Sequence, residues 1–409
     1  MPDLLPETLE KMNWLEDRSR KIFRVFGYEE IRTPMLEETE VFTRSIGEDT
    51  DIVEKEMYTL LDRGGKSISL RPEGTASIIR AYIEHGWANL QDVVKLFYVG
   101  PMFRGERPQK GRLRQFHQIG AEMIGGKDPV VDAELISNLN ELLSELGVKG
   151  FTILINSLGC QKDRKVYKEK LASYLKEKIS SFCPDCVRRA DKNILRVLDC
   201  KNENCKKAVK DAPIMLDSLC DDCSARYTAL KNILKDLKIP FSEKKDLVRG
   251  LDYYTGIVFE VTHPSLGAQD AIAAGGRYDD LCKEMSGPEA GATGYAVGVE
   301  RLLLCLDEKD IPKKNKGILI VPVGDDLKLD AFYLAGQFRK ERIPCETDLT
   351  GRSFKGQMRK ANKENRKYIV ILGEEEKKNG KMLLKNMTDG AQETLSFDEV
   401  VKKVREELS

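Results

Sequence analysis

The sequence has 409 residues, enough for two or three domains with at least one sizeable core. Hydrophobic residues make up 41% and charged residues 33%, a balance that excludes a disordered chain, and no apolar run approaches the roughly 18 residues of a membrane-spanning helix. Lys+Arg and Asp+Glu both number 67, so the formal net charge is zero, but a zero total can hide a local basic patch that binds nucleic acid.

The first residues are acidic and polar, unlike a secretory signal, so we expect a cytoplasmic protein without a membrane partner. Apolar residues at helical spacing then predict helices over 7–26 and 132–146. Runs of β-prone residues, in hairpin-like pairs split by polar turns, predict strands at 67–71, 93–100, 116–125, 151–155, 256–263 and 296–300. Such pairs favour a mostly antiparallel sheet flanked by helices, which is an α+β fold.

Two later segments have a different pattern. Residues 156–245 are rich in Lys and Cys and mainly helical in pattern, so we interpret them as an insertion within a first domain of residues 1–310. After a polar linker at 307–317, strand and helix patterns alternate as far as residue 373. Alternation of this kind predicts a small, mostly parallel α/β domain over residues 317–409.

The densest cluster of charged residues lies at 96–122, where two predicted strands flank a loop. Arginine forks match phosphate oxygens, so five cations opposed by one acid indicate an anion-binding site rather than a solvated hairpin tip. Alternation in the second strand places Phe116, Gln118 and Glu122 on one face, where they would form a polar pocket. The charged residues of the loop are Arg104, Glu106, Arg107, Lys110, Arg112 and Arg114.

Three further segments carry polar residues at strand ends or helix starts. Glu73 and Thr75 follow a predicted strand, where Glu73 has the alternative interpretation of a stabilising first-turn acid. Arg249 and the pair Tyr253–Tyr254 precede another strand, for which an edge-strand aromatic pair is the alternative. Arg301 lies just inside a helix that follows a glycine-containing strand.

Together these segments resemble class II aminoacyl-tRNA synthetases in their histidine-specific form. Residues 96–122 look like motif 2 of that class, 296–302 like motif 3, and 27–42, with Pro34, like the motif 1 that builds its dimer interface. The peptides LVRGLDYYTG (247–256) and AAGGRYDDL (273–281) resemble two signatures of histidyl-tRNA synthetases. The resemblance extends from residue 3 to about 405, because the C-terminal α/β unit is similar to the family's anticodon-binding domain.

The resemblance implies ATP-dependent activation of L-histidine to histidyl-adenylate, followed by transfer to the 3′ end of tRNA(His), with AMP and pyrophosphate as products. It also implies a homodimer, Mg²⁺ with ATP, and catalytic roles for Arg104 and Arg249. The implied ATP ligands are Arg104, Arg112, Phe116 and Arg301. The implied histidine ligands are Glu73, Gly74, Thr75, Gln118, Glu122, Arg249, Tyr253 and Tyr254.

Paralogues of these enzymes provide the main alternative, because some serve as histidine-sensing regulatory subunits of ATP phosphoribosyltransferase. Such subunits typically lack the anticodon domain and part of the motif 2 residues, whereas this sequence retains both. A class II ligase for threonine or proline would share motifs 2 and 3, but the peptide at 247–256 argues against it.

Six of the ten cysteines lie between residues 183 and 223. In a reducing compartment such clustering indicates metal ligation rather than disulfides. Two Cys-x-x-Cys pairs predict a structural zinc site made by Cys183, Cys186, Cys220 and Cys223.

Residues 352–368 contain seven cations and one acid. A basic helix of this kind is a candidate face for tRNA phosphates, and an ordinary solvated helix is the alternative.

Overall fold

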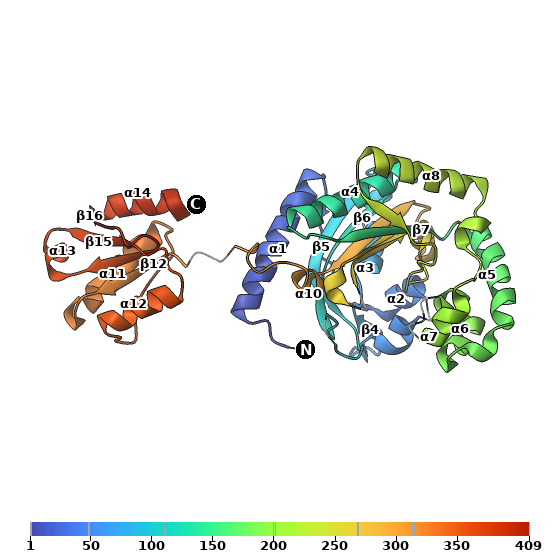
Figure 1. Ribbon diagram of the computed structural model, residues 1–409, viewed down its shortest axis with the longest axis horizontal. Coiled ribbons are helices and arrows are strands. Elements are labelled where there is room, and N and C mark those ends of the chain that lie inside the picture. The colour runs from blue at the N-terminus through green and yellow to red at the C-terminus, as the bar shows by residue number, and fades with distance from the viewer. Residues whose placement is uncertain are drawn as a thin grey trace. The chain divides into compact units, whose positions relative to one another are not determined.

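The computed structural model describes residues 2–408 apart from 48–49, 110, 199, 201, 268–269 and 313–315. The chain divides into two compact units, Met1–Ile311 and Pro312–Ser409 (Figure 1). Lys110 of the predicted anion-binding loop and residues 313–315 of the predicted linker lie outside the described residues. Among the helices that the structure describes, none is both long and apolar enough to cross a membrane.

An eight-stranded sheet forms the centre of the first unit, and it confirms the predicted α+β class. The six strands from β5 to β7 pair antiparallel, and only β1 and β8, at the two edges, pair parallel. In sheet order the strands are β1 (Glu29–Glu30), β5 (Val94–Phe103), β6 (Gln115–Ile124), β11 (Ala292–Gly298), β10 (Ala271–Arg277), β9 (Thr255–Thr262), β7 (Thr152–Ser157) and β8 (Phe241–Glu243).

Two sequence predictions need correction here. Strand β10 was not predicted, because its small residues give a weak strand signal. The strand predicted at 296–300 begins four residues earlier, and Val299 and Glu300 already belong to helix α10 (Val299–Leu303).

Helices cover both faces of this sheet (Figure 1). One face packs against α1 (Pro6–Val25), α4 (Pro129–Glu145), α8 (Asp221–Asp236) and α10. The other packs against α3 (Thr75–Glu84) and α9 (Leu281–Glu284). Alternation along β5 explains this division, since Phe97 joins the first apolar cluster while Leu96 and Tyr98 join the second.

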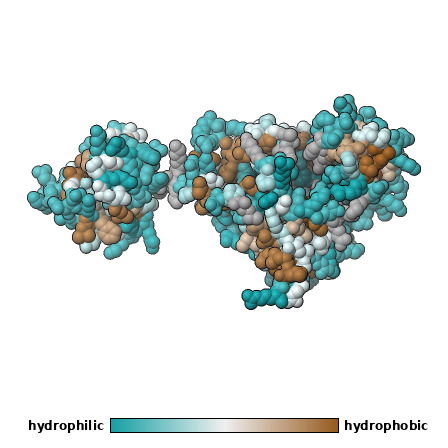
Figure 2. Space-filling view, turned by 90° about the horizontal axis from the view of Figure 1, so that it is seen from below, coloured by the Kyte–Doolittle hydropathy of each residue, from teal (hydrophilic) through white to brown (hydrophobic). Residues whose placement is uncertain are grey.

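A small three-stranded sheet and α2 (Thr39–Ile46) complete this part of the unit. Its strands, in sheet order, are β2 (Leu36–Glu38), β4 (Ser67–Leu70) and β3 (Thr59–Leu61). Several of its hydrophobic side chains are exposed, and hydrophobic patches interrupt a largely hydrophilic surface on the face seen in Figure 2.

The inserted helices have a hydrophobic core of their own, which includes Leu171, Val197 and Met215. They are α5 (Gln161–Lys176), α6 (Pro184–Lys192), α7 (Glu203–Val209) and the short helices η3 (Ile179–Ser181), η4 (Ile194–Val197) and η5 (Met215–Ser218). Helix α8 falls within the residues predicted as the insertion, but its Leu230 and Leu234 pack into the core of the main sheet.

The described residues of the second unit form a five-stranded sheet with four α-helices. In sheet order its strands are β13 (Cys345–Thr347), β12 (Ile318–Pro322), β14 (Tyr368–Leu372), β15 (Lys381–Asn386) and β16 (Gln392–Ser396). The helices are α11 (Lys328–Lys340), α12 (Phe354–Lys363), α13 (Glu374–Lys378) and α14 (Phe397–Leu408). The first three strands pair parallel, as predicted, but β15 and β16 are antiparallel, so the sheet is mixed rather than mostly parallel. The hairpin escaped prediction because β16 has no fully buried residue.

Candidate functional site

A cleft of about 1060 Å³ lies over the main sheet beside the start of α3, and it gathers most of the predicted site residues. Gly74 and Glu122 do not line it: Gly74 precedes the first residue of α3, and the Glu122 side chain is completely buried. The predicted residues that line the cleft are Glu73, Thr75, Arg104, Arg112, Phe116, Gln118, Arg249, Tyr253, Tyr254 and Arg301.

The loop between β5 and β6 supplies two arginines to this cleft. The guanidinium group of Arg104 lies 5.3 Å from the centre of the Phe116 ring, and its Nε donates to the Pro72 carbonyl at 2.9 Å. Arg112 forms an ion pair with Glu106 at 3.0 Å. An arginine fixed over an aromatic ring presents charge and a flat apolar surface together, which suits a nucleotide.

Arg301 of α10 lies in the same cleft and is held by two backbone carbonyls. Its Nε donates to Gly111 at 3.0 Å and its Nη1 to Ala271 at 2.6 Å. Burial and the nearby charge of Arg112 lower the pKa of Arg301 from its usual value. These two bonds fix the direction of the guanidinium group before any ligand binds.

Arg249 lines the cleft from a different segment of the chain, the one that precedes β9. Its Nη1 is 2.6 Å from Oε2 of Glu260 on β9, and both side chains are largely buried. Glu260 also lines the cleft, although it was not among the predicted site residues. The sequence did contain a clue to this residue, because Glu260 interrupts an otherwise apolar strand at 256–262.

The Glu73 carboxylate stabilises a helix start, which was the alternative role considered for it from the sequence. It accepts hydrogen bonds from the backbone N–H groups of Thr75 and Ala76, at 2.7 and 2.9 Å, and so stabilises the start of α3. Burial raises the pKa of Glu73, although these bonds oppose the shift. The same carboxylate also lines the cleft, so the two interpretations are compatible.

Glu122 lies at the centre of a buried hydrogen-bond network. The Thr75 hydroxyl donates to its Oε1 at 2.7 Å, and the Tyr278 hydroxyl donates to its Oε2. Burial raises the pKa of Glu122 to about 8, against the opposing effect of these two bonds. Gly294 faces Glu122 across the β6–β11 pair, and a Cβ there would overlap the carboxylate.

Tyr278 belongs to the signature peptide at 273–281 but was not selected from sequence. Its ring is completely buried and lies 5.5 Å from that of Tyr253, which in turn lies 4.7 Å from that of Tyr254. Only the tertiary fold could reveal its bond to Glu122, because 156 residues separate the two.

Gln118 presents a buried acceptor to the cleft. Its Oε1 has no hydrogen-bond partner among the residues that the structure describes. A buried carbonyl oxygen without a donor costs about 1–3 kcal/mol. A ligand with an N–H donor, such as an ammonium group, would recover that free energy.

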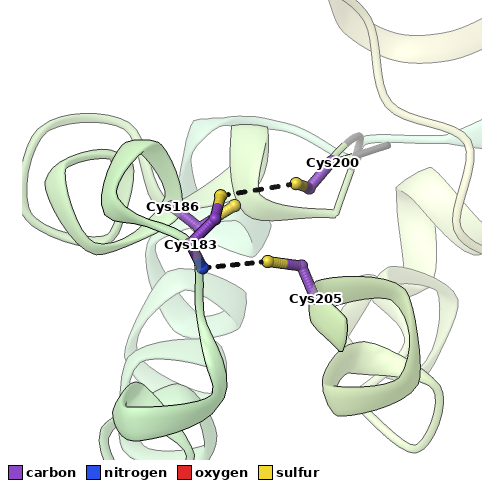
Figure 3. A group of neighbouring side chains, drawn as sticks. All are labelled: Cys183, Cys186, Cys200 and Cys205. Atoms are coloured by element: carbon purple, nitrogen blue, oxygen red, sulfur yellow. Dashed lines mark hydrogen bonds between the residues drawn. The ribbon is translucent and has the colours of Figure 1, made fainter. Parts of the chain in front are cut away.

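The cysteines form two groups rather than the predicted one. Cys183, Cys186, Cys200 and Cys205 come together in one group (Figure 3), and a second group contains Cys220 and Cys223 with Cys160 and Asp163. The predicted four-cysteine set is therefore wrong in its second half. The two Cys-x-x-Cys pairs begin different helices, α6 and α8, and the partners of the first pair are instead Cys200 and Cys205, the latter on α7.

In the second unit, the cations of the predicted basic helix divide into paired and exposed groups. Arg366 is buried and pairs with Glu346 at 2.7 Å, and Arg352 pairs with Asp348 at 3.0 Å. Lys360 also pairs with Glu346, at 3.0 Å. Three other cations recur at every fourth position, so they share one face of α12, and they form no ion pair with any described residue. These exposed cations are Lys355, Arg359 and Lys363.

Known proteins resemble both units. The histidyl-tRNA synthetase family model matches residues 1–302, and the anticodon binding domain model matches residues 317–407. A histidine–tRNA ligase of Syntrophotalea carbinolica is 45% identical over 406 residues, which cover 99% of this chain and 97% of the relative.

Solved structures agree with this assignment. The apo histidyl-tRNA synthetase of S. aureus has a TM-score of 0.82 at 36% identity and covers 99% of this chain and 98% of its own. An ATP phosphoribosyltransferase regulatory subunit/histidyl-tRNA synthetase from Bacillus halodurans C has a TM-score of 0.66 at 22% identity, covers 91% of this chain and 97% of its own, and shows a shared fold alone. Since the family model spans most of the chain and a relative is 45% identical over nearly its whole length, the chain belongs to the histidyl-tRNA synthetase family.

Proposed function

We propose that this chain activates L-histidine with ATP and transfers the histidyl group to the 3′ end of tRNA(His). One observation carries the proposal: Arg104, Arg249 and Arg301 line a single cleft together with the buried acceptor Gln118. Cationic groups suit the phosphates of ATP and the carboxylate of an amino acid, and the acceptor suits its ammonium group.

The first step brings two anions together. A carboxylate oxygen of histidine attacks the α-phosphorus of ATP, the bond from that phosphorus to the bridging oxygen breaks, and pyrophosphate leaves. Arg104 and Arg249 would stabilise the charge that develops on the α-phosphate between them, and Arg112 and Arg301 would hold the β- and γ-phosphates. Phe116 offers a surface on which adenine can stack.

The histidine pocket would use the polar groups beside the arginines. Glu73, Thr75 and Gln118 would bind the ammonium group, and Glu122 and Tyr254 would bind the imidazole. The pKa of about 8 keeps most Glu122 carboxyl groups protonated at neutral pH in the empty pocket, so Glu122 can donate as well as accept. A site built to hydrogen-bond its substrate rejects analogues by about 10⁴–10⁵.

Mg²⁺ would bind as a complex with the phosphates of ATP. Glu56, Glu106 and Glu300 line the cleft and provide the carboxylate oxygens that Mg²⁺ prefers.

In the second step a terminal ribose hydroxyl of tRNA attacks the carbonyl carbon of the adenylate, and AMP leaves.

Two surfaces support the proposed macromolecular partners. The exposed cations Lys355, Arg359 and Lys363 would contact tRNA phosphates. The proposed homodimer would bury hydrophobic side chains near β2 and β3, where Met35, Leu36, Leu60 and Leu61 are 45–70% exposed. The cytoplasmic location stays a prediction.

Pyrophosphate exchange with each of the twenty amino acids, followed by charging of total tRNA, tests the proposal. Exchange with histidine alone, together with charging, is the expected result. Histidine binding without exchange would instead favour the regulatory-subunit alternative, which a binding assay with ATP phosphoribosyltransferase would then examine.

A further inference from the structure

We propose that Cys183, Cys186, Cys200 and Cys205 bind one zinc ion, and that this ion fixes the inserted helices against the rim of the cleft. The four sulfur atoms all lie within 4.8 Å of one another, although the cysteines come from three separate stretches of chain. Nothing in the proposed aminoacylation chemistry requires this group.

The spacing of the sulfur atoms matches a tetrahedral site. With zinc–sulfur bonds of about 2.3 Å, the edges of a ZnS₄ tetrahedron are about 3.8 Å long. Sγ of Cys183 lies 3.9 Å from Sγ of Cys200, and the four side chains converge on one point (Figure 3). Bound zinc would therefore need only small movements of these side chains.

Local sequence and backbone geometry also fit a metal site. The ligands form one Cys-x-x-Cys pair and one pair separated by four residues, a spacing within the usual range for zinc. Backbone N–H groups donate to two of the sulfurs, from Cys183 to Cys205 Sγ at 3.2 Å and from Asn202 to Cys200 Sγ at 3.4 Å. Hydrogen bonds of this kind orient sulfur ligands around a metal ion.

The second group, around Cys220, has a different explanation. The Asp163 carboxylate accepts backbone N–H groups of Cys160 at 3.2 Å and of Cys220 at 3.0 Å, so it stabilises the starts of α5 and α8. Cys220 is also exposed. This group therefore supplies a matched control for the four-cysteine site.

The segment between the first cysteine pair and Cys200 also contacts the rim of the cleft. Arg189 of α6 and Arg196 of η4 both pair with Asp51, at 2.9 and 3.1 Å. Asn193, between them, donates to both carboxylate oxygens of Asp252 at 2.8 and 2.9 Å. Asp252 lies between Arg249 and Tyr253 of the proposed histidine site, so zinc at the cysteines would hold the segment that presents them.

Metal content provides the first test. Wild-type protein, purified through a tag that binds no metal and without added zinc, should contain one zinc ion per chain by mass spectrometry. The double variant Cys183→Ser/Cys200→Ser should lose it, and Cys220→Ser/Cys223→Ser should keep it. Zinc retained by the first double variant, iron in place of zinc, or a disulfide among the four cysteines would overturn the proposal.

Cobalt substitution covers the case in which the first double variant does not fold. Wild-type protein loaded with Co²⁺ should show the intense visible bands and sulfur-to-cobalt charge transfer of a tetrahedral four-thiolate site. A spectrum typical of oxygen and nitrogen ligands would contradict the ligand set.

Hydrogen exchange tests the effect on the cleft without any assay of activity. Removal of the metal from wild-type protein should speed amide exchange in residues 182–210 and also in 50–56 and 247–254. Asn193→Ala should speed exchange in 247–254 while it keeps its zinc. Faster exchange confined to 182–210 after metal removal would show that the ion stabilises the insertion but does not hold the rim of the cleft.

Discussion

The guanidinium group of Arg249 and the carboxylate of Glu260 are joined by an ion pair of 2.6 Å in the wall of the cleft. Arg249 stands on the segment before β9, and Glu260 stands on β9 itself. The pair therefore fixes the proposed catalytic cation to the central sheet. The Arg249 side chain is thus oriented before the reaction, so no free energy is spent on ordering it in the transition state.

Replacement of Arg249 by histidine should slow histidine-dependent pyrophosphate exchange by about 10²–10³, which is the usual loss for one donor that stabilises charge in a transition state. Arg80→His is a matched control, because Arg80 also pairs with a carboxylate at 2.6 Å, that of Glu37, but does not line the cleft. A near-normal exchange rate in the Arg249 variant would show that Arg249 does not take part in adenylate formation.

Glu260→Gln should reduce exchange by roughly tenfold to a hundredfold, since the neutral amide holds Arg249 less firmly. The measurement is a double-mutant cycle with Arg249→His. If Glu260 acts through Arg249, its replacement should cost little in the Arg249→His background. Fully additive losses would mean that Glu260 has a separate role.

Glu122→Gln should change how stability depends on pH. The pKa of Glu122 rises from 4.5 to about 8 on folding, so its contribution is complete below pH 4.5 and is lost as pH rises towards 8. Between pH 5 and 8 the wild type should lose roughly 2–4 kcal/mol more unfolding free energy than the glutamine variant. Denaturant titrations at several pH values measure this, and parallel curves for the two proteins would contradict the shift. Buried groups common to both proteins cancel in the comparison.

The triple variant Lys355→Glu/Arg359→Glu/Lys363→Glu should weaken tRNA binding while histidine-dependent pyrophosphate exchange stays normal. Each lost phosphate contact should lower the slope of log affinity against log salt by about 1. The triple variant Lys378→Glu/Lys381→Glu/Lys402→Glu, at exposed positions outside α12, controls for the change in net charge. Unchanged charging kinetics would show that α12 is an ordinary solvated helix that does not contact tRNA.

The sequence alone determined the order of the elements and the chemistry of the cleft. Local periodicity predicted α1, α4 and most strands of the main sheet, because an amphipathic pattern follows from which face of an element is buried. The motif segments contained ten of the residues that later proved to share one cleft. Where the signal was weak, as in the small-residue strand β10 and the polar hairpin β15–β16, the prediction missed the element.

Only the tertiary structure decided which distant residues meet. The Glu122–Tyr278 bond and the Arg249–Glu260 pair depend on strand register, because a shift of one residue would turn Glu122 of β6 or Glu260 of β9 to the other face of the sheet. The cysteines illustrate the same limit: equal Cys-x-x-Cys spacings suggested one site, but the packing of separate helices joined Cys183 and Cys186 to Cys200 and Cys205. Sequence spacing specifies contacts within a few residues, whereas longer contacts are set by the packing of the whole core.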